Sequence, residues 1–253
     1  NVRNFKSTTL AVVRTARRDR LEENPEDVLR AGNRHYRTEK DLPDTVSLFP
    51  LSGALLLPCG QMPLNIFEPR YLSMIDDALA SDRLIAIIQP RFDIAGDVDR
   101  MEHPPLCSVG TIGRITSLTE TGDGRYIMSL IGVCRFRLLE EVAGKKVYRR
   151  GRIAPFLGDL ADDAGADDVD RKSLLHTFKS YLEANQLEAD WESVKQASNT
   201  TLVNTMSMMA PYGPAEKQAL LEAPDLKTRA ETLIAMTEIA LARNGGDDET
   251  MLQ

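Results

Sequence analysis

Residues 47–82 read SLFPLSGALLLPCGQMPLNIFEPRYLSMIDDALASD. Three short apolar runs, at 48–51, 54–57 and 62–67, are separated by proline and glycine, which favour turns. Such runs predict three short strands. Pro69 suits the first turn of a helix, and apolar residues spaced three and four apart continue to Leu79. The stretch therefore predicts three strands followed by a helix over residues 69–81.

The next part of the chain predicts further strands. Residues 84–89 form an apolar run that is too short for a helix and is typical of a strand buried on both faces. Residues 107–120 and 125–140 flank the sequence TGDG, which predicts a hairpin, and residues 147–155 predict a last strand. Gly110, Gly113 and Gly132 predict bulges or bends. Together these features predict a compact, partly closed β-barrel with one inserted helix.

The pattern changes after Leu157, where aspartates replace the apolar residues and the hydrophobic period then becomes helical. Asp190 is expected to cap a short helix, and Gly245-Gly246 to end the last one. The predicted fold class is α+β. The predicted domains are a flexible N-terminal extension (1–45), a β-barrel (46–157), an acidic linker (158–170), an all-helical bundle (171–245) and a polar tail (246–253).

Composition and missing motifs exclude several classes of protein. The net charge of −7 argues against non-specific nucleic-acid binding, and no apolar run approaches the roughly 20 residues that span a bilayer. Three scattered cysteines predict a reducing, cytoplasmic location without disulfides. The sequence has no P-loop, no HExxH and no GxSxG motif, and its three histidines lack ligand spacing. We therefore expect neither enzymatic activity nor a cofactor or metal.

Several blocks of the chain resemble the Lon protease N-terminal domain, also called the Lon substrate-binding domain. They are SLFPLSGALLLPCGQMPLNIFEPRYLSMIDDAL, LIAIIQP, LCSVGTIGRITSLTETGDGRYIMSLIGVCRFRLLEE, YRRGRIAP and MAPYGPAEKQALLEAPDLKTRAETL. The resemblance covers roughly residues 44–243 and implies a PUA-like β-barrel followed by a helical bundle. In full-length Lon this domain precedes an ATPase module and a Ser-Lys protease domain. Neither occurs in these residues, so the resemblance implies a stand-alone Lon-domain protein.

This resemblance leads to the hypothesis of a non-enzymatic module that binds unfolded or apolar protein segments. A barrel with bulged strands can leave an apolar groove for an extended peptide. The candidate groove residues are Leu56, Pro58, Met62, Leu64, Ile66 and Phe67. The alternative is that these side chains form the barrel core. A Lon-type protease is a second candidate partner, and the sequence indicates no oligomeric state.

Three other interpretations remain open. PUA-like barrels occur in RNA-associated proteins, and Arg149, Arg150 and Arg152 form a candidate basic patch, with Arg150 and Arg152 sharing a sheet face with Tyr148. Cys59 is a candidate nucleophile, although a lone cysteine is more often a small apolar residue. The helical half is a candidate assembly element. Glu68 and Arg70 flank Pro69, and we expect Glu68 to cap the helix and Arg70 to pair with a strand carboxylate.

Overall fold

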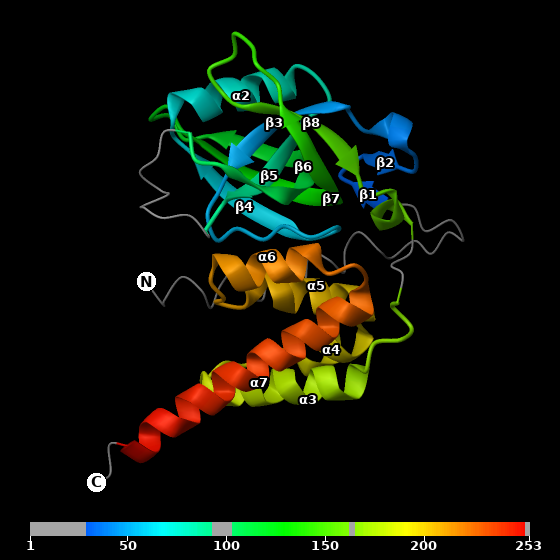
Figure 1. Ribbon diagram of the computed structural model, residues 1–253, viewed down its shortest axis with the longest axis vertical. Helices are drawn as coiled ribbons and strands as arrows, with labels where there is room; N and C mark the ends of the chain where they lie inside the picture. Colours follow the sequence, from blue (N-terminus) through cyan, green and yellow to red (C-terminus); the bar gives the residue numbers. More distant parts are fainter. Residues whose placement is uncertain (1–28, 93–102, 162–164, 251–253) are drawn as a thin grey trace. The chain divides into compact units, whose positions relative to one another are not determined.

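The computed structural model describes residues 29–92, 103–161 and 165–250, with side chains as far as Arg243 (Figure 1). The strands are β1 (Leu29–Ala31), β2 (Arg34–Tyr36), β3 (Thr45–Pro50), β4 (Gln61–Ile66), β5 (Leu84–Pro90), β6 (Leu106–Glu120), β7 (Tyr126–Glu141) and β8 (Arg150–Pro155). The α-helices are α2 (Pro69–Leu79), α3 (Arg171–Ala184), α4 (Trp191–Gln196), α5 (Asn199–Met209), α6 (Pro214–Glu222) and α7 (Leu226–Thr250). Two short 3-10 helices are η2 (Glu39–Asp41) and η4 (Leu157–Leu160).

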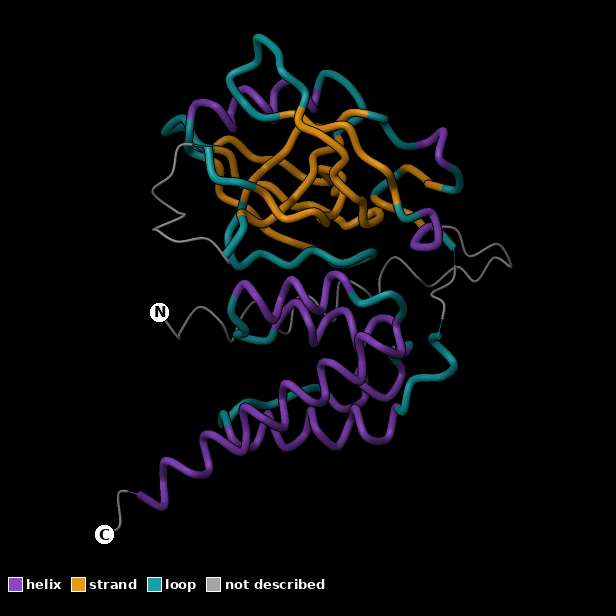
Figure 2. Tube along the Cα trace, viewed as in Figure 1, coloured by secondary structure: helices purple, strands orange, loops and turns teal. Residues whose placement is uncertain are grey.

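Five strands close a β-barrel. Strand β3 pairs with β5 in parallel and with β8 in antiparallel orientation, and the antiparallel pairs β5–β6, β6–β7 and β7–β8 complete the ring. Figure 2 shows these strands, in orange, wrapped around a common interior. Strand β4 lies outside the ring and pairs with β7 alone. Helix α2 follows β4, so the prediction of a β-barrel with one inserted helix is confirmed.

Glycines shape the two longest strands. The register of β6 against β7 shifts between Ile112 and Gly113, where the partner residues pass from Cys134 to Gly132. The predicted bends at Gly113 and Gly132 are therefore confirmed. Gly110 borders a register shift in the β5–β6 ladder, where the pairing passes from Ile88 opposite Gly110 to Pro90 opposite Leu106. It also allows close packing, because a Cβ there would lie 2.6 Å from the carbonyl oxygen of Ile87.

The middle of the opening stretch differs from the prediction. Residues 54–57 are not a strand, although the side chains of Leu55, Leu56 and Leu57 are buried. Gly53 and Cys59 adopt left-handed backbone conformations, with φ of +66° and +61°, so the chain turns on both sides of the run. Side-chain bonding replaces strand pairing, since the Thr111 hydroxyl donates to the carbonyl of Leu56 at 2.6 Å. The stretch thus forms two strands joined by a buried loop.

The N-terminal extension is shorter than predicted. Residues 1–28 lie outside the described residues, but β1 and β2 form an antiparallel hairpin. The side chains of Ala31, Tyr36 and Leu42 join the main hydrophobic cluster of the barrel. The tyrosine hydroxyl accepts a hydrogen bond from Arg114 Nη1 at 3.3 Å. Residues 29–45 therefore belong to the barrel, because apolar side chains at this spacing bury against β6 and β7.

The described residues divide into two compact units, and the division does not follow the chain order. The barrel unit contains β1 to β8, α2, both 3-10 helices and also α6. Within it, α6 packs against β6, and Gln218 Nε2 donates to the carbonyl of Val109 at 3.1 Å. Lys217 Nζ donates to the carbonyl of Gly53 at 2.8 Å. The predicted bundle over residues 171–245 is therefore wrong at α6, which completes the barrel unit.

The start of the predicted acidic linker also belongs to the barrel unit. Residues 157–160 form η4, and the side chains of Asp159 and Leu160 are buried. Asp159 accepts hydrogen bonds from the backbone and guanidinium of Arg135 on β7. Asp159, which the sequence assigns to an acidic linker, is therefore the buried partner of an ion pair.

The helical unit consists of α3, α4, α5 and α7. Asp190 caps α4 as predicted, since its carboxylate accepts from the backbone N–H groups of Glu192 and Ser193. Arg229 Nη1 donates to Asn204 Oδ1 at 2.9 Å and joins α7 to α5. Helix α7 runs to Thr250, so the prediction that Gly245-Gly246 ends it is wrong. Glycine lowers helix propensity by about 1 kcal/mol per residue, which weakens a helix without stopping it. Within the described ranges, every helix is too short or too polar to cross a lipid bilayer.

Candidate functional site

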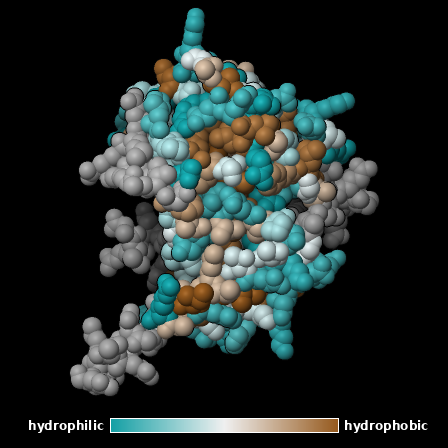
Figure 3. Space-filling model, viewed as in Figure 1, coloured by the Kyte–Doolittle hydropathy of each residue, from teal (hydrophilic) through white to brown (hydrophobic). Residues whose placement is uncertain are grey.

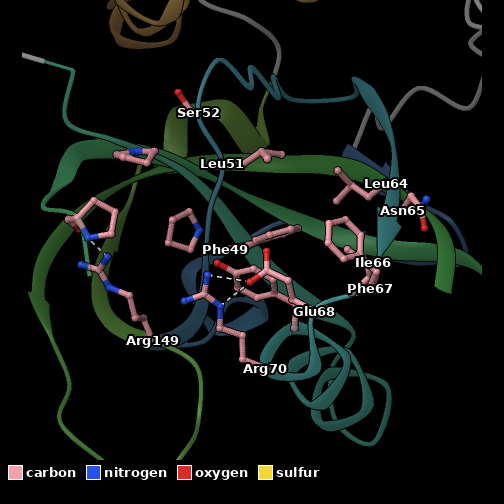
Figure 4. A pocket seen from close by; sticks show the side chains of 14 residues that line it. Phe49, Leu51, Ser52, Leu64, Asn65, Ile66, Phe67, Glu68, Arg70 and Arg149 are labelled. Atoms are coloured by element: carbon pink, nitrogen blue, oxygen red, sulfur yellow. Dashed lines mark hydrogen bonds and ion pairs between the residues drawn. The ribbon is translucent and has the colours of Figure 1, made fainter. Parts of the chain in front are cut away.

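A pocket of about 340 Å³ opens in the barrel unit between the end of β3, strand β4 and the first turn of α2 (Figure 4). This volume lies within the range of about 300–1,000 Å³ that is typical of ligand pockets. Nine of its fourteen lining residues are apolar or aromatic, and polar and apolar atoms contribute about equally to its exposed surface. The lining residues are Phe49, Pro50, Leu51, Ser52, Leu64, Asn65, Ile66, Phe67, Glu68, Arg70, Tyr71, Pro90, Pro104 and Arg149.

Local sequence features place the apolar wall. Leu64 and Ile66 are two residues apart on β4 and therefore point to the same side of the strand. The rings of Phe49 and Tyr71 lie with their centroids 4.4 Å apart, which joins the end of β3 to α2. Burial raises the pKa of the Tyr71 hydroxyl, so that it remains a neutral hydrogen-bonding group. At the rim, the side chain of Phe67 is 61% exposed. The pocket thus has a fixed apolar floor and an aromatic side chain at its mouth.

Two arginines bring positive charge to this apolar pocket, and Figure 4 shows both side chains directed toward it. Arg149 is held firmly. Its Nε and Nη2 bond to the two carboxylate oxygens of Glu141 at 2.7 and 2.5 Å, and its Nη1 donates to the carbonyl of Pro104 at 2.6 Å. Only 13% of its side chain is exposed. Arg149 is therefore a rigid part of the wall.

Arg70 is held more loosely. Its Nε and Nη2 both bond to one oxygen, Oε2, of Glu68, each at 2.9 Å. The guanidinium also lies 4.6 Å from the ring centroid of Tyr71. The expected roles of this pair are wrong. Glu68 is the N-cap residue of α2 but makes no side-chain capping bond, and Arg70 pairs with it instead of with a strand carboxylate, because the two side chains flank Pro69 on the same turn.

The structure separates the predicted groove residues into two groups. Leu64, Ile66 and Phe67 line the pocket. Leu56 and Pro58 are buried in the loop that crosses the barrel, and Met62 is half-buried and does not line the pocket. The alternative interpretation as core is therefore right for Leu56 and Pro58, which are buried and do not line the pocket. Ile66, which is 2% exposed, belongs both to the core and to the floor of the pocket.

The predicted basic-aromatic patch does not form. Strand β8 begins at Arg150, and Tyr148 is buried before it, with its hydroxyl donating to Asp77 Oδ2 at 2.6 Å. Arg149 pairs with Glu141, and Arg152 pairs with Glu140 at 2.9 Å. Because these carboxylates neutralise two of the three arginines, Arg149, Arg150 and Arg152 form a poor surface for nucleic-acid phosphates.

Two further kinds of site, a reactive cysteine and a metal site, can be assessed in the described residues. Cys59 is exposed, whereas Cys107 and Cys134 are buried. Burial raises the pKa of the Cys134 thiol to about 12, so this thiol stays protonated and unreactive at neutral pH. Among the described residues, no three His, Cys, Asp or Glu side chains lie close enough together to form a metal site.

Sequence reasoning missed part of the pocket. Phe49, Tyr71, Pro90 and Pro104 come from four separate segments and meet only because the barrel closes. The signal that was available is Glu68-Pro69-Arg70, where two opposite charges adjoin an apolar strand at the start of a helix. That pattern is common at helix starts and does not by itself indicate a pocket.

Comparisons with known proteins point to one family. The ATP-dependent protease La (LON) substrate-binding domain matches residues 45–238. Lon protease 2 of Sorangium cellulosum is 27% identical over 199 residues, which are 76% of this chain and 24% of that protein. Lon protease of Parabacteroides distasonis is 30% identical over 201 residues, covering 76% of this chain and 23% of that protein. The chain thus spans about a quarter of the length of these curated relatives.

Two solved structures share the fold. The Lon N-terminal domain protein from Xanthomonas campestris superposes with a TM-score of 0.55 at 20% identity, covering 76% of this chain and 97% of that one. The N-terminal domain of Mycobacterium avium complex Lon protease gives a TM-score of 0.57 at 18% identity, covering 77% and 98%. The match to the substrate-binding domain covers most of the chain and includes every residue that lines the pocket, so this protein belongs to the Lon substrate-binding domain family.

Proposed function

We propose that this chain is a non-enzymatic protein-binding module that takes apolar side chains of unfolded or partly unfolded proteins into the pocket beside β4. The observation that carries this proposal is the apolar pocket with an exposed phenylalanine, Phe67, at its mouth. Family membership supports it, because the matched region is described as a substrate-binding domain. Figure 3 adds that hydrophobic side chains gather over the barrel strands on the face in view.

The expected affinity is low. Burying one aromatic side chain of about 200 Å² at about 25 cal/mol per Å² contributes about 5 kcal/mol before the costs of association are subtracted. A pocket of this size therefore favours weak and broad binding, which suits the transient sampling of unfolded chains. A Lon-type protease is the second partner that we propose, on the strength of the Lon relatives alone.

The test is titration calorimetry of the full chain with a permanently unfolded, carboxymethylated model protein. We expect binding in the micromolar range, and we expect Phe67→Ser to weaken it by about five- to tenfold, the effect of losing one buried aromatic contact. The matched control is Leu139→Ser, which removes another exposed apolar side chain (46%) that does not line the pocket. Absence of binding at high micromolar concentration, or equal losses in the two variants, would contradict the proposal.

A cytoplasmic location is part of the same proposal. Cys59, Cys107 and Cys134 are not joined in disulfides in the described part of the chain, and unbridged cysteines are usual in a reducing compartment.

A further inference from the structure

The pocket combines apolar side chains with two arginines that are held unequally firmly. Its ionisable lining consists of Arg70, Arg149 and Glu68, apart from the tyrosine. Both arginines are paired with carboxylates, Arg70 with Glu68 and Arg149 with Glu141. An anionic group of a ligand therefore gains a guanidinium partner at this pocket only by taking the place of one of these two carboxylates.

The two arginines differ in how easily they can accept a new partner. Arg149 is mostly buried and makes three short hydrogen bonds, to Glu141 and to Pro104. The Arg70–Glu68 pair is open to solvent, with 38% and 42% of the side chains exposed. Exposed pairs of this kind contribute only about 0–1 kcal/mol. A ligand carboxylate can therefore displace Glu68 from Arg70 at little cost, whereas Arg149 stays in place.

The geometry of Arg70 prepares it for this exchange. Both of its bonds go to the single oxygen Oε2 of Glu68, which is not the fork-to-fork arrangement that a guanidinium and a carboxylate prefer. Its stacking on Tyr71 at 4.6 Å keeps the guanidinium at the pocket when the partner changes.

The edge of β4 indicates how the ligand chain runs. Among the described residues, strand β4 has one hydrogen-bonded neighbour, β7, so its other edge can accept an added strand. Exposed Pro63 in the middle of β4 fits an edge position, where proline is tolerated. Leu64, Asn65 and Ile66 lie on this strand and also line the pocket. An extended segment beside β4 can thus pass the pocket and continue in both directions, so its carboxylate comes from a side chain.

We propose that the pocket selects extended segments in which an apolar residue has an aspartate or glutamate one or two positions away, with the carboxylate binding Arg70 in place of Glu68. This inference rests on the proposed function and narrows it. Binding by apolar burial alone is indifferent to acidic neighbours, whereas binding at this pocket favours them.

The experiment compares short fluorescent peptides that are acetylated and amidated and contain Phe-Leu preceded by either Glu or Gln. Fluorescence anisotropy with the full chain at low salt measures their affinities. We expect the Glu peptide to bind about two- to threefold tighter, because its carboxylate can pair with Arg70 through both oxygens whereas Glu68 uses one, and we expect the preference to shrink at high salt.

Two variants are expected to change peptide binding in opposite directions, so a loss of folding cannot explain both results. Arg70→Gln should abolish the preference for Glu over Gln. Glu68→Gln should strengthen binding of the Glu peptide, because Arg70 loses its competing partner. Arg152→Gln is the matched control, since it removes an equivalent paired arginine that does not line the pocket, and should change nothing.

Three outcomes would contradict these proposals. Equal affinity of the Glu and Gln peptides overturns this inference and leaves the proposed function intact. Failure of both peptides and of the unfolded protein to bind overturns both. If a Gln peptide with a free C-terminal carboxylate binds more tightly than the amidated Gln peptide, and the amidated Glu peptide does not, the assignment of the carboxylate to a side chain is overturned.

Discussion

Gly132 lies at the closest approach of two backbones in the barrel unit. A Cβ built on it would lie 2.1 Å from the carbonyl oxygen of Leu57, which belongs to the buried loop between β3 and β4. The same residue donates its N–H to the carbonyl of Gly60 at 2.8 Å and accepts from the N–H of Cys59 at 2.9 Å. Neither backbone can withdraw without losing these bonds, so the position requires glycine.

We therefore expect Gly132→Ala to destabilise the barrel unit by about 3 kcal/mol or more, the upper range for overpacking. The change in the free energy of unfolding is measured by urea unfolding, monitored by far-ultraviolet circular dichroism. Gly144→Ala is the control, because a Cβ there has no neighbour within 4 Å, and it should be nearly neutral. Equal stability of the two variants would show that the loop can move away from β7.

At the scale of single elements, α3 begins with a well-formed cap. Asp170 accepts from the backbone N–H of Ser173 at 3.0 Å and from its hydroxyl at 2.7 Å. These hydrogen bonds lower the pKa of the Asp170 carboxyl, with the backbone bond as the largest cause. The ionised form is thus favoured in the folded state.

This cap predicts a pH-dependent stability. A carboxyl whose pKa is lower in the folded state contributes stability at pH values above its unfolded pKa, and the contribution is lost as the pH falls through the folded pKa. Asp170→Asn keeps a capping oxygen but does not titrate, so we expect it to match the wild type more closely as the pH is lowered from 7 to 2. Asp170→Ala should lower the melting temperature at pH 7 more than Asn does. A constant difference between wild type and Asp170→Asn across this pH range would contradict the assignment.

At the scale of the whole molecule, the chain leaves the barrel unit after η4 and returns to it as α6. Arg135 joins the parts of this unit from its centre. Its guanidinium bonds to both carboxylate oxygens of Asp159 on η4 at 2.8–2.9 Å, and its Nη1 donates to the carbonyl of Leu221 in the last turn of α6 at 3.0 Å. A cation is favourable at a helix C-terminus, where carbonyl groups lack helical partners.

Breaking this buried pair should loosen η4 and α6 from the barrel. We expect Asp159→Asn to lower the free energy of unfolding by about 3 kcal/mol, because the arginine charge stays buried without its partner. Native-state hydrogen exchange should show faster exchange in α6 than in α3. Glu140→Gln, which breaks the exposed pair with Arg152, is the control and should cost less than about 1 kcal/mol. Equal exchange of α6 in both variants would show that Gln218 and Lys217 suffice to anchor it.

How much of this molecule was predictable depended on the range of the interactions involved. Helix α2, strand β5 and the β6–β7 hairpin follow from patterns within a few residues, and the structure agrees with them. The run at 54–57 has the apolar composition of a strand, yet its side chains fill the core from a loop. The apolar composition predicted burial there correctly, but it did not predict the turns at Gly53 and Cys59 that keep the segment out of the sheet.

The candidate site divides in the same way. Of the groove residues predicted from the sequence, Leu64, Ile66 and Phe67 line the pocket. Glu68 and Arg70 line it as well, although the sequence indicated for them only a helix cap and an ion pair. The sequence could not add Phe49, Pro90, Pro104 or Arg149, which reach the pocket from distant segments. Hydrophobic periodicity and turn residues by themselves indicated a β-barrel with an inserted helix, followed in the chain by helices, because strand and helix periods are visible within a few residues. Only the closed tertiary structure decided which apolar residues are core, which arginines are neutralised by carboxylates, and where a pocket remains, because each of these depends on atoms that are far apart in the sequence.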